Sequence, residues 1–476
     1  MIGTGRSDAC DDKPPGSSNE AQAIHRDAVL YKTTAGRELS NLSHINSRTL
    51  SYAMSITPQQ AKILKESVPV IAADGQAIAN LMYGRLLGDH PELNHIFNVV
   101  HQHTGRQPKA LAMALYAYAN NIDDLGKLSP ALELICQKHA SLYLKPEYYD
   151  IVGTYLLDAM RDILDDEFTD EMRDAWKAGY SLLAQTMIGR EVKLYAQASG
   201  WTDWRDFRIV RKVPECEDVA SFYLEPVESF VGGDGTLPPF LPGQYISVRV
   251  MVPDLGKLQP RQYSLSDAPN GKYYRISVKR EVGGYVSNVL HHKRVGDIVQ
   301  VAHPYGEFTF DPTTSPEDVP VVLIGAGIGC TSLLSMLNSV ATAQQKKRPV
   351  SWVHCARRAG LRSFLPHIQE LKSQLPLLHT VLFASRPLRK DVVGTDYDRY
   401  GRIELAKLSP DSDLFLKDSR TQYFVCGPDD FMSDITKGLR AMGVAADRVH
   451  WEQYGDGGVE AHLPGGWPTQ ANLARW

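Results

Sequence analysis

Four consecutive residues, Arg261, Gln262, Tyr263 and Ser264, combine side chains that suit a flat ligand carrying phosphate groups. The guanidinium of an arginine presents a planar fork to phosphate oxygens, and a tyrosine ring covers an apolar ring face and excludes water. A turn-forming string, Pro242-Gly243-Gln244-Tyr245, lies upstream. Short patterns of this kind often arise by chance, so the surrounding sequence decides what this one means.

A second candidate element lies downstream, where paired glycines precede an expected helix. The string is Gly283-Gly284-Tyr285-Val286-Ser287-Asn288. Glycines permit a tight turn, and we expect Ser287 to cap the helix, which leaves backbone N–H groups free to bind a pyrophosphate. For this element alone, the alternative is an ordinary glycine hairpin beside a capped helix.

Together the two elements resemble the FAD-binding signatures of the ferredoxin-reductase family. The resemblance implies that Arg261 pairs with the FAD pyrophosphate, that Tyr263 packs on the isoalloxazine ring, and that Ser264 forms a hydrogen bond near the reactive flavin nitrogen. The residues that it implies for FAD are Tyr245, Arg261, Gln262, Tyr263, Ser264, Gly284, Val286 and Ser287.

A glycine-rich loop after an apolar run is the third candidate element. Residues 321–324 lead into Gly325-Ala326-Gly327-Ile328-Gly329-Cys330-Thr331-Ser332, and we expect the next helix over residues 333–340. Glycines let the backbone approach the phosphates of a dinucleotide, which then lie at the helix N-terminus. Cys426-Gly427-Pro428 follows another apolar run and resembles the C-G-P that flanks the nicotinamide in the same family.

The coenzyme-binding residues implied by these two strings are Gly327, Ile328, Gly329, Cys330, Thr331, Ser332, Cys426, Gly427 and Pro428. Cys330 and Ser332 depart from the glutamine and proline that are common in relatives. The choice between NADH and NADPH stays open. Arg357, Arg358 and Arg386 are candidates for contact with a 2′-phosphate, and a solvated surface arginine is the alternative for each.

A different kind of candidate lies upstream, in helix-forming sequence. His139 occurs in the string Ile135-Cys136-Gln137-Lys138-His139-Ala140, and Tyr83, Phe97 and Gln107 precede it. Taken alone, His139 is an ordinary helix-face histidine. Neutral imidazole is also the usual axial ligand of heme, and hydroxyl and amide groups opposite it suit the binding of oxygen.

Strings spread over most of the chain resemble the flavohemoglobin (flavohemoprotein) family, which joins a globin to an FAD- and NAD-binding reductase. They are Ile96-Phe97-Asn98, Lys138-His139, Lys145-Pro146-Glu147, Asp206-Phe207-Arg208-Ile209-Val210 and Arg261-Gln262-Tyr263-Ser264-Leu265. The resemblance covers residues 57 to about 456, with the three parts in the order of the family.

This resemblance implies roles for residues that the local motifs do not define. His139 is the implied proximal ligand of the iron of heme b, and Tyr149 and Glu191 lie beside it. Such neighbours increase the donation of the imidazole to iron. Further heme-pocket residues are Tyr83 and Gln107 on the distal side, with Phe97, Leu111 and Lys138 around the heme. Near the flavin the implied residues are Glu452, Gln453, Tyr454, Gly455 and Asp456, of which Gln453 and Tyr454 depart from the commonest residues.

The hydrophobic pattern divides the chain into the parts that would position these residues. From a capping-box string at residues 57–60, helical periodicity continues over 106–121, 128–140, 147–165 and 169–197. Strand-like alternation follows, and strands then alternate with helices from residue 319. We therefore expect an all-α globin over 57–200, an antiparallel β-barrel that binds FAD over 203–313, and an α/β domain that binds NAD(P) over 318–476.

Residues 1–56 lack sustained apolar periodicity, so we expect a disordered leader or a targeting segment. Arg26, Lys32 and Arg37 suit a mitochondrial presequence, whereas Asp11 and Asp12 argue against one. We expect a cytoplasmic protein, with a mitochondrial location as the alternative if the segment acts as a presequence. A start at Met54 would omit the leader.

Composition excludes several classes of protein. A formal net charge of -4 gives no electrostatic reason to expect a nucleic acid partner. The six cysteines contain no C-x-x-C pair, which argues against a disulfide framework or a thiolate metal site. Residues 319–337 are the one run long enough to resemble a membrane span, but Pro320 and the glycines suit a strand, loop and helix better.

The activity implied by the family is nitric oxide dioxygenation, in which NAD(P)H reduces FAD, FAD reduces heme, and heme-bound O2 converts NO to nitrate. O2 and NO are the expected small-molecule partners, and we expect a monomer with no obligate protein partner and no stable membrane insertion. Two alternatives stay open: an oxygen carrier or sensor whose reductase repairs oxidised iron, and a reductase of hydroperoxides or ferric acceptors.

Overall fold

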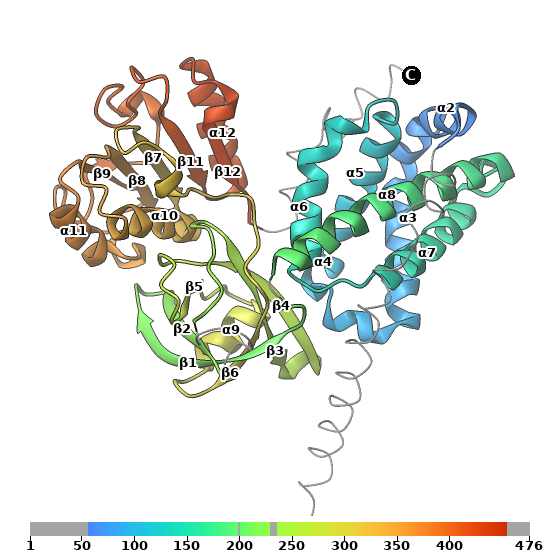
Figure 1. Ribbon diagram of the computed structural model, residues 1–476, viewed down its shortest axis with the longest axis horizontal. Coiled ribbons are helices and arrows are strands. Elements are labelled where there is room, and N and C mark those ends of the chain that lie inside the picture. The colour runs from blue at the N-terminus through green and yellow to red at the C-terminus, as the bar shows by residue number, and fades with distance from the viewer. Residues whose placement is uncertain (1–55, 199, 229–235, 455–476) are drawn as a thin grey trace, which may run out of the picture. The chain divides into compact units, whose positions relative to one another are not determined.

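The computed structural model describes residues 56–198, 200–228 and 236–454 (Figure 1). The described residues from Ile56 onward belong to one compact unit. The expected leader, apart from Ile56, lies outside the described residues, and so do Gly455 and Asp456.

Helices make up the first part, as the periodicity predicted. They are α2 (Pro58–Glu66), α3 (Val68–Asp89), α4 (Val99–His103), α5 (Arg106–Asn120), α6 (Ser129–Ala140), α7 (Pro146–Leu164) and α8 (Asp170–Gln197). The capping box at the start of α2 is present, because Thr57 and Gln60 each accept a hydrogen bond from the other's backbone N–H.

The helices enclose one apolar core. Helix α3 packs against α5 and α7, and α2 packs against α8. Leu64, Ile71 and Met82 are fully buried in this core. Trp176 is also buried, and its indole N–H donates to the Ser67 hydroxyl at 3.2 Å, which satisfies a polar group that would otherwise be costly to bury.

An antiparallel barrel follows, as predicted. Its strands are β1 (Arg205–Pro214), β2 (Val219–Pro226), β3 (Tyr245–Val252), β4 (Lys257–Ser264), β5 (Tyr274–Lys279) and β6 (Ile298–Val301), in the order β4-β3-β6-β1-β2-β5. Leu265, next after β4, pairs with Ile276 of β5 and closes the barrel. Trp201 and Phe207 stack in its core with ring centroids 5.7 Å apart.

The short helix α9 (Tyr285–His292) corrects one detail of the sequence interpretation. Its N-terminal cap is Gly284, and Ser287 lies inside the helix rather than at the cap. The Ser287 hydroxyl instead accepts a hydrogen bond from the backbone N–H of Glu281 at 3.2 Å. The turn between β5 and α9 therefore places the serine one turn later than the string suggested.

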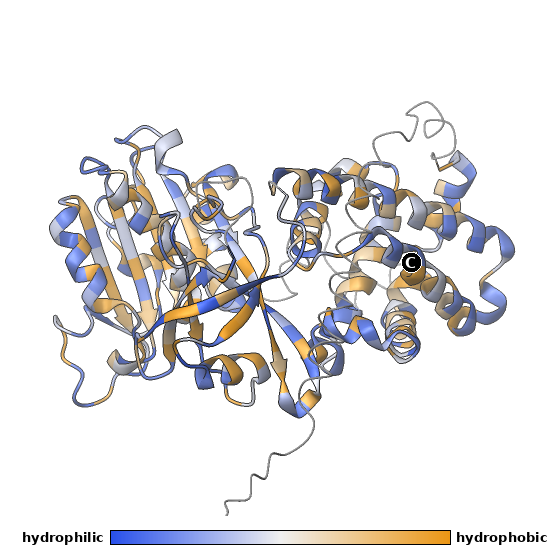
Figure 2. Cartoon of the chain, turned by 60° about the horizontal axis from the view of Figure 1, so that its bottom comes forward, coloured by the Kyte–Doolittle hydropathy of each residue, from blue (hydrophilic) through white to orange (hydrophobic). Residues whose placement is uncertain are grey.

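The last part is a parallel sheet in the order β10-β9-β8-β7-β11-β12. The strands are β7 (Val321–Ala326), β8 (Val350–Ala356), β9 (Leu378–Ala384), β10 (Arg399–Tyr400), β11 (Gln422–Cys426) and β12 (Val449–Glu452). Its helices are α10 (Cys330–Thr342), α11 (Leu365–Gln374) and α12 (Asp429–Ala441). Hydrophobic residues line the strands (Figure 2), and β8 is buried throughout. Helix α10 begins three residues earlier than predicted.

No helix within the described ranges is long and apolar enough to span a membrane. The apolar run at residues 319–337 forms β7, the glycine loop and the first half of α10. The expectation that this run folds as a strand, loop and helix is confirmed.

Candidate functional site

His139 lies in the last turn of α6, and two side chains from other helices fix its ring. Its Nδ1 is 2.9 Å from Oε1 of Glu191 in α8 and 2.8 Å from the hydroxyl of Tyr149 in α7. The Tyr149 hydroxyl donates to the same carboxylate oxygen at 2.5 Å. Glu191 is almost fully buried, with 2% of its surface exposed. The structure thus brings to His139 two residues that are 10 and 52 positions away from it in the sequence.

This contact determines which nitrogen of His139 is available to a ligand. A carboxylate only accepts hydrogen bonds, so Nδ1 carries the proton and Nε2 is the free acceptor. Burial, and secondarily the charge of Glu191, raise the pKa of Tyr149 far above its usual range, so its hydroxyl stays a donor. No hydrogen bond engages Nε2 among the residues that the structure describes. A neutral imidazole oriented in this way fits an axial heme ligand.

A second group of predicted residues faces the same helical core. The Gln107 amide lies 3.5 Å from the Tyr83 hydroxyl, at the outer limit of a hydrogen bond, and the Tyr83 and Phe97 rings meet edge to face with centroids 5.7 Å apart. Tyr83 and Leu111 pack against the same buried core. A hydrogen bond of this length is weak.

Residues of α6 and α8 connect the two groups. Leu132, Tyr180 and Leu183 pack against the core that contacts Tyr83, and also against the cluster of Tyr149 and Cys136 near His139. The Tyr180 hydroxyl donates to the Tyr149 carbonyl at 2.7 Å. An imidazole with a free Nε2, a hydroxyl, an amide and apolar side chains, gathered around this core, are groups that suit a heme pocket. Lys138 precedes His139 and is half-buried.

The end of α6 that carries His139 is also bound to the barrel. The side-chain oxygen Oε1 of Gln137 accepts from the Gly306 N–H at 3.1 Å, and its side-chain nitrogen Nε2 donates to Glu307 at 2.6 Å. Glu133, one turn earlier in α6, forms a two-pronged ion pair with Arg190 of α8. Burial raises the pKa of Glu307, and the charge of Glu133 adds to the effect.

A hydrogen-bond chain also joins this helix end to the FAD element. The Gln262 amide donates to the Ser247 hydroxyl at 2.9 Å, and that hydroxyl donates to Ser141 at 2.9 Å. Ser141 follows His139 by two positions. The Gln262 side chain is thus engaged within the protein, on the side of the barrel that faces α6.

Four other residues predicted for FAD, Tyr245, Arg261, Tyr263 and Ser264, lie on the paired strands β3 and β4. Tyr245 is directly opposite Ser264 in their register. Burial raises the pKa of Tyr245 and of Tyr263, so both rings are neutral. The Arg261 side chain is half-buried, and its guanidinium donates to the Pro260 carbonyl at 2.6 Å. Neutral rings beside one cationic fork fit the ring and pyrophosphate of FAD.

The glycine loop lies between β7 and α10, as predicted. Gly327 has a φ of +56°, a conformation that L side chains rarely adopt, and a Cβ on Gly329 would lie 2.3 Å from the carbonyl oxygen of Cys426. The loop therefore packs directly on the predicted C-G-P segment. A methyl group cannot fit at position 329, so the close packing of the loop requires glycine there. The loop leads into the start of α10, where the phosphates of a dinucleotide bind in folds of this kind.

His354 supports this loop and was missed in the sequence. It lies on β8, is 1% exposed, and its Nε2 is 3.0 Å from the Gly327 carbonyl oxygen. Burial, and then the nearby Arg362, lower the pKa of His354 to about 3, so the imidazole is neutral and Nε2–H donates to the loop. No motif marks this residue, because the contact depends on the pairing of β7 with β8.

Tyr454 joins the flavin and coenzyme elements. Its hydroxyl is 3.2 Å from the Ser264 hydroxyl and 3.0 Å from the Thr331 hydroxyl. Burial raises the pKa of the neighbouring Cys426 thiol to about 12 and that of the Glu452 carboxyl to about 8. Glu452 Oε2 is buried without a hydrogen-bond partner. The structure thus places the end of β12 at the meeting point of both predicted elements, whereas Gln453 makes no such contact.

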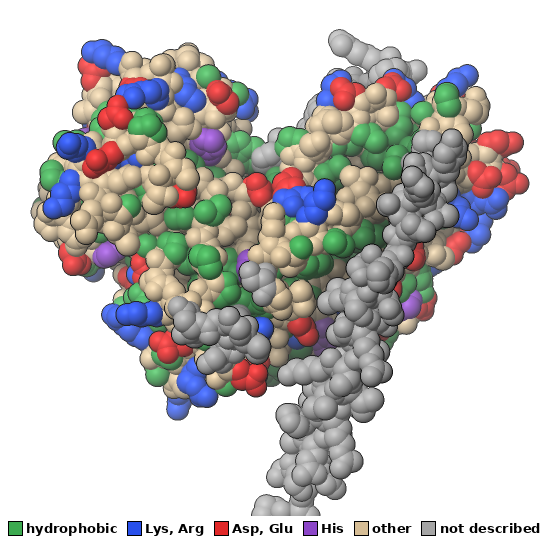
Figure 3. All heavy atoms as spheres, in the orientation of Figure 1, with side chains coloured by type: hydrophobic (Ala, Val, Ile, Leu, Met, Phe, Trp, Pro, Cys, Tyr) green, Lys and Arg blue, Asp and Glu red, His purple; other side chains and the backbone are tan. Residues whose placement is uncertain are grey.

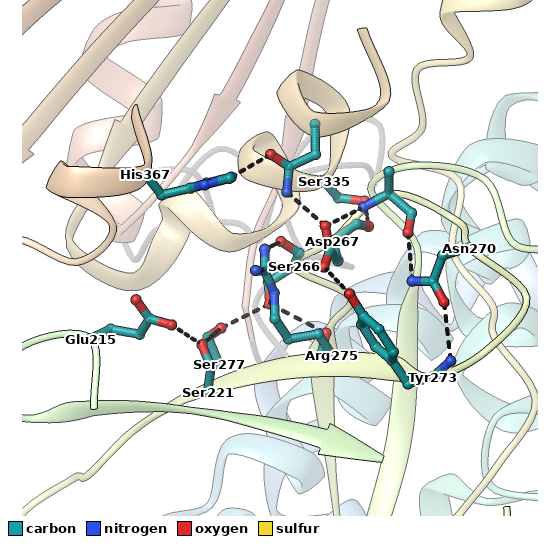
Figure 4. Close-up of polar contacts among 12 residues, drawn as sticks. Glu215, Ser221, Ser266, Asp267, Asn270, Tyr273, Arg275, Ser277, Ser335 and His367 are labelled. Carbon is teal, nitrogen blue, oxygen red and sulfur yellow. Dashed lines mark hydrogen bonds and ion pairs between the residues drawn. The ribbon is translucent and has the colours of Figure 1, made fainter. Parts of the chain in front are cut away.

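A buried polar network holds the barrel against α10 (Figure 4). The Asp267 carboxylate accepts from Asn338 of α10 at 2.9 Å and from Tyr273 at 3.0 Å, and Ser335 donates to the Asp267 carbonyl at 2.7 Å. The buried Arg275 forms an ion pair with Asp267. Because Asp267 follows Ser264 by three positions, these contacts fix the FAD element relative to the coenzyme loop.

On the face shown in Figure 3, acidic and basic side chains are interspersed and form no extended patch of one sign.

Within the described ranges, no group of three or more His, Cys, Asp or Glu residues could hold a metal ion. Heme iron needs only one protein ligand, so a heme site does not require such a group.

Three protein-family models match the chain, in the order of the structural parts. The globin model matches residues 80–187, the oxidoreductase FAD-binding domain model matches residues 206–310, and the oxidoreductase NAD-binding domain model matches residues 323–437.

Known proteins match nearly the whole described chain. The flavohemoprotein of Bordetella parapertussis is 43% identical over 413 residues, which are 85% of this chain and 100% of that protein. The flavohemoprotein of Chromobacterium violaceum is 41% identical over 84% of this chain and 98% of its own length. The crystal structure of flavohemoglobin from Malassezia yamatoensis, with bound FAD and heme, superposes with a TM-score of 0.73 at 27% identity, over 84% of this chain and 100% of that chain.

Proposed function

Because this chain belongs to the flavohemoprotein family, we propose that it is an NAD(P)H-dependent nitric oxide dioxygenase that uses heme b and FAD. One observation carries the proposal. His139 is oriented by the buried Glu191, while residues two positions to either side of it, Gln137 and Ser141, are bound to the barrel that holds the FAD element. Hydrogen bonds thus connect the helix end that carries the proposed heme ligand directly to the barrel that carries the proposed FAD site.

When bound, FAD accepts a hydride and releases electrons singly, and heme supplies the iron at which O2 and NO combine to give nitrate. The protein contributes orientation and exclusion of water. Glu191 accepts a hydrogen bond from the Nδ1–H group of His139. This contact leaves Nε2 as the nitrogen that would bind the heme iron, and it makes the imidazole a stronger electron donor to iron. Tyr149 donates to the same carboxylate and holds it in place.

On the opposite side of the pocket, we assign donors for an oxygen ligand to Tyr83 and Gln107. A phenolic hydroxyl and a side-chain amide can each donate a hydrogen bond to a partly anionic oxygen. Phe97 and Leu111 keep water out of this space. A protected pocket with hydroxyl and amide donors suits oxygen chemistry better than reduction of a bulky hydroperoxide.

In the reductase part, we assign Arg261, Tyr245, Tyr263 and Ser264 to FAD and the loop at residues 327–332 to the coenzyme. Cys426 and Gly427 lie against this loop at Gly329, and we assign the Cys426-Gly427-Pro428 segment to the nicotinamide. The proposed domain limits are 57–200 for the globin, 203–313 for the FAD-binding barrel and 318–476 for the NAD(P)-binding domain.

Since one chain carries all three parts, it needs no obligate partner, and we propose a cytoplasmic monomer. A mitochondrial location stays the alternative if residues 1–56 act as a presequence.

The test is product analysis with the purified, heme- and FAD-loaded chain. With NAD(P)H, O2 and NO supplied, nitrate should form, with two nitrate ions for each coenzyme oxidised, because a hydride carries two electrons and each nitrate requires one. Coenzyme oxidation without nitrate above background would refute the proposal.

The alternative activities give different results in the same assay. A carrier or sensor would consume one equivalent of NO in a burst and afterwards only as much as the repair of its oxidised iron allows, whereas a hydroperoxide or ferric reductase would turn over fastest with those acceptors. Comparing turnover with NO, a lipid hydroperoxide and ferric citrate therefore ranks all three.

A further inference from the structure

A groove of about 690 Å³ lies where the barrel meets the parallel sheet. On the barrel side, Lys279 at the end of β5 and residues 280–282 after it line the groove, and on the sheet side residues that follow β8 and β9 do so. Arg357 comes directly after β8, and Arg386 lies two positions after β9. Neither the FAD element nor the glycine loop lines this groove.

The charges of the groove are not balanced. Arg358 donates to Glu217 at 2.6 Å, and Lys279 pairs with Glu281 at 2.5 Å, so these cations already have partners. Arg357 and Arg386 are exposed, and within the described residues their side chains make no hydrogen bond or ion pair. The backbone N–H of Arg386 donates to the Arg357 carbonyl at 2.7 Å, which holds the two residues side by side.

The position of this pair relative to the glycine loop identifies its ligand. Strand β8 is the parallel neighbour of β7, and Ala326, at the start of the loop, pairs with Cys355 near the end of β8. In doubly wound sheets, a dinucleotide whose pyrophosphate lies on the loop after one strand places its adenosine ribose beyond the end of the next strand. A carboxylate there binds the ribose hydroxyls of NAD, and an arginine accommodates the 2′-phosphate of NADP.

Beyond β8 this chain has arginines and no acidic residue over positions 357–362. We propose that Arg357 and Arg386 bind the 2′-phosphate of NADPH, and that NADPH rather than NADH is the coenzyme. Each guanidinium offers two parallel N–H donors to phosphate oxygens. Leu361 and Leu388, also in the groove, supply an apolar wall for the adenine. This inference rests on the proposed function only in that the reductase part oxidises a nicotinamide coenzyme.

Reduction of ferricyanide by the full, FAD-loaded chain tests the proposal, because this assay needs neither NO nor the heme ligand. The wild type should show a kcat/KM for NADPH at least about 10-fold above that for NADH, the value of one to two charge-assisted hydrogen bonds. In the double variant Arg357→Ala/Arg386→Ala, kcat/KM should fall about 10- to 100-fold with NADPH, mainly through KM, and by less than about threefold with NADH.

The control variant is Arg440→Ala, an exposed arginine of α12 that does not line the groove. It should behave as the wild type with both coenzymes. Charge reversal in Arg357→Glu should invert the preference towards NADH, because a carboxylate repels the phosphate and accepts from the ribose hydroxyl. Equal kcat/KM values for the two coenzymes in the wild type, or a double variant that loses both equally, would overturn the proposal.

Calorimetry supplies a readout that needs no turnover. Adenosine 2′,5′-bisphosphate should bind the wild type at least about 10-fold more tightly than adenosine 5′-monophosphate, and the double variant should bind both alike. Equal binding of the two nucleotides by the wild type would contradict the assignment. These outcomes are independent of nitrate formation, so the coenzyme site and the nitric oxide chemistry can fail separately.

Discussion

His139 and the loop around Gly329 are both points of ligand attachment, but the protein holds them in different ways. His139 is fixed by side chains of two other helices, through hydrogen bonds of 2.8 to 2.9 Å. Gly329 is held by close steric packing, because its backbone lies so near the Cys426 carbonyl that a Cβ would not fit. Hydrogen bonds can be weakened in steps, whereas a steric fit is lost at once. The two regions should therefore respond differently to small substitutions.

The largest effect is expected from His139→Ala, which removes the proposed heme ligand. His139→Ala should abolish heme binding, because it removes Nε2, the proposed iron ligand. The Soret band and nitrate formation should disappear, while NADPH still reduces the flavin. Absorption spectra of purified protein before and after NADPH check this. Retention of a normal Soret band with normal NO consumption would show that another residue binds the iron.

Gly329→Ala tests the steric half of the comparison. The added methyl would lie 2.3 Å from the Cys426 carbonyl oxygen, so the loop must move and the coenzyme site should be lost. We expect kcat/KM for NADPH to fall at least about 100-fold with heme and flavin contents unchanged. Gly189→Ala is the matched control, because nothing lies within 4 Å of its added Cβ. Near-normal coenzyme kinetics in Gly329→Ala would mean that the loop accommodates the methyl group and still binds the coenzyme, which would contradict the steric account.

A graded response is expected from Glu191→Gln, which keeps the shape and the acceptor but removes the charge. The imidazole then donates less to iron, so the heme midpoint potential should rise and NO turnover should fall about 10-fold, with heme retained. Spectroelectrochemistry and nitrate assays measure both. Tyr149→Phe, which removes only the hydroxyl that holds the carboxylate, should give a smaller change in the same direction. An unchanged potential in Glu191→Gln would contradict the assigned role.

The smallest effect concerns the support of the loop by His354. Its pKa is about 3 in the folded chain and near the usual 6.5 when unfolded, so below pH 6.5 the unfolded chain binds a proton that the folded chain does not. Stability is therefore full above pH 6.5 and is lost as the pH falls towards 3. His354→Gln should reduce the loss between pH 7 and 4.5 by about 2 kcal/mol.

Urea midpoints of the full chain at the two pH values measure this loss. His103→Gln, at an exposed histidine of α4, serves as the control and should match the wild type. An identical pH dependence in His354→Gln and the wild type would contradict the account of the loop.

The same contrast explains what could be predicted from the sequence. The parallel sheet, the barrel and the glycine loop follow from local patterns, since each strand and its turn are contiguous. The His139, Tyr149 and Glu191 cluster spans three helices, and only the resemblance to a family related them. His354 and the Gln262–Ser247–Ser141 chain were not predicted, because strand register and the packing of α6 on the barrel are set by tertiary contacts. Ser287 was misplaced by one turn, since Gly284 caps α9 without a side chain.

The most direct test of the central claim, that electrons pass within one chain from coenzyme through flavin to the heme on His139, is anaerobic stopped-flow reduction by NADPH. Flavin absorbance should fall first and the ferrous heme band should follow, with a rate constant for heme reduction that is unchanged over a tenfold range of protein concentration. A rate constant that rises in proportion to protein concentration, or a heme that stays ferric while the flavin is reduced, would contradict the account.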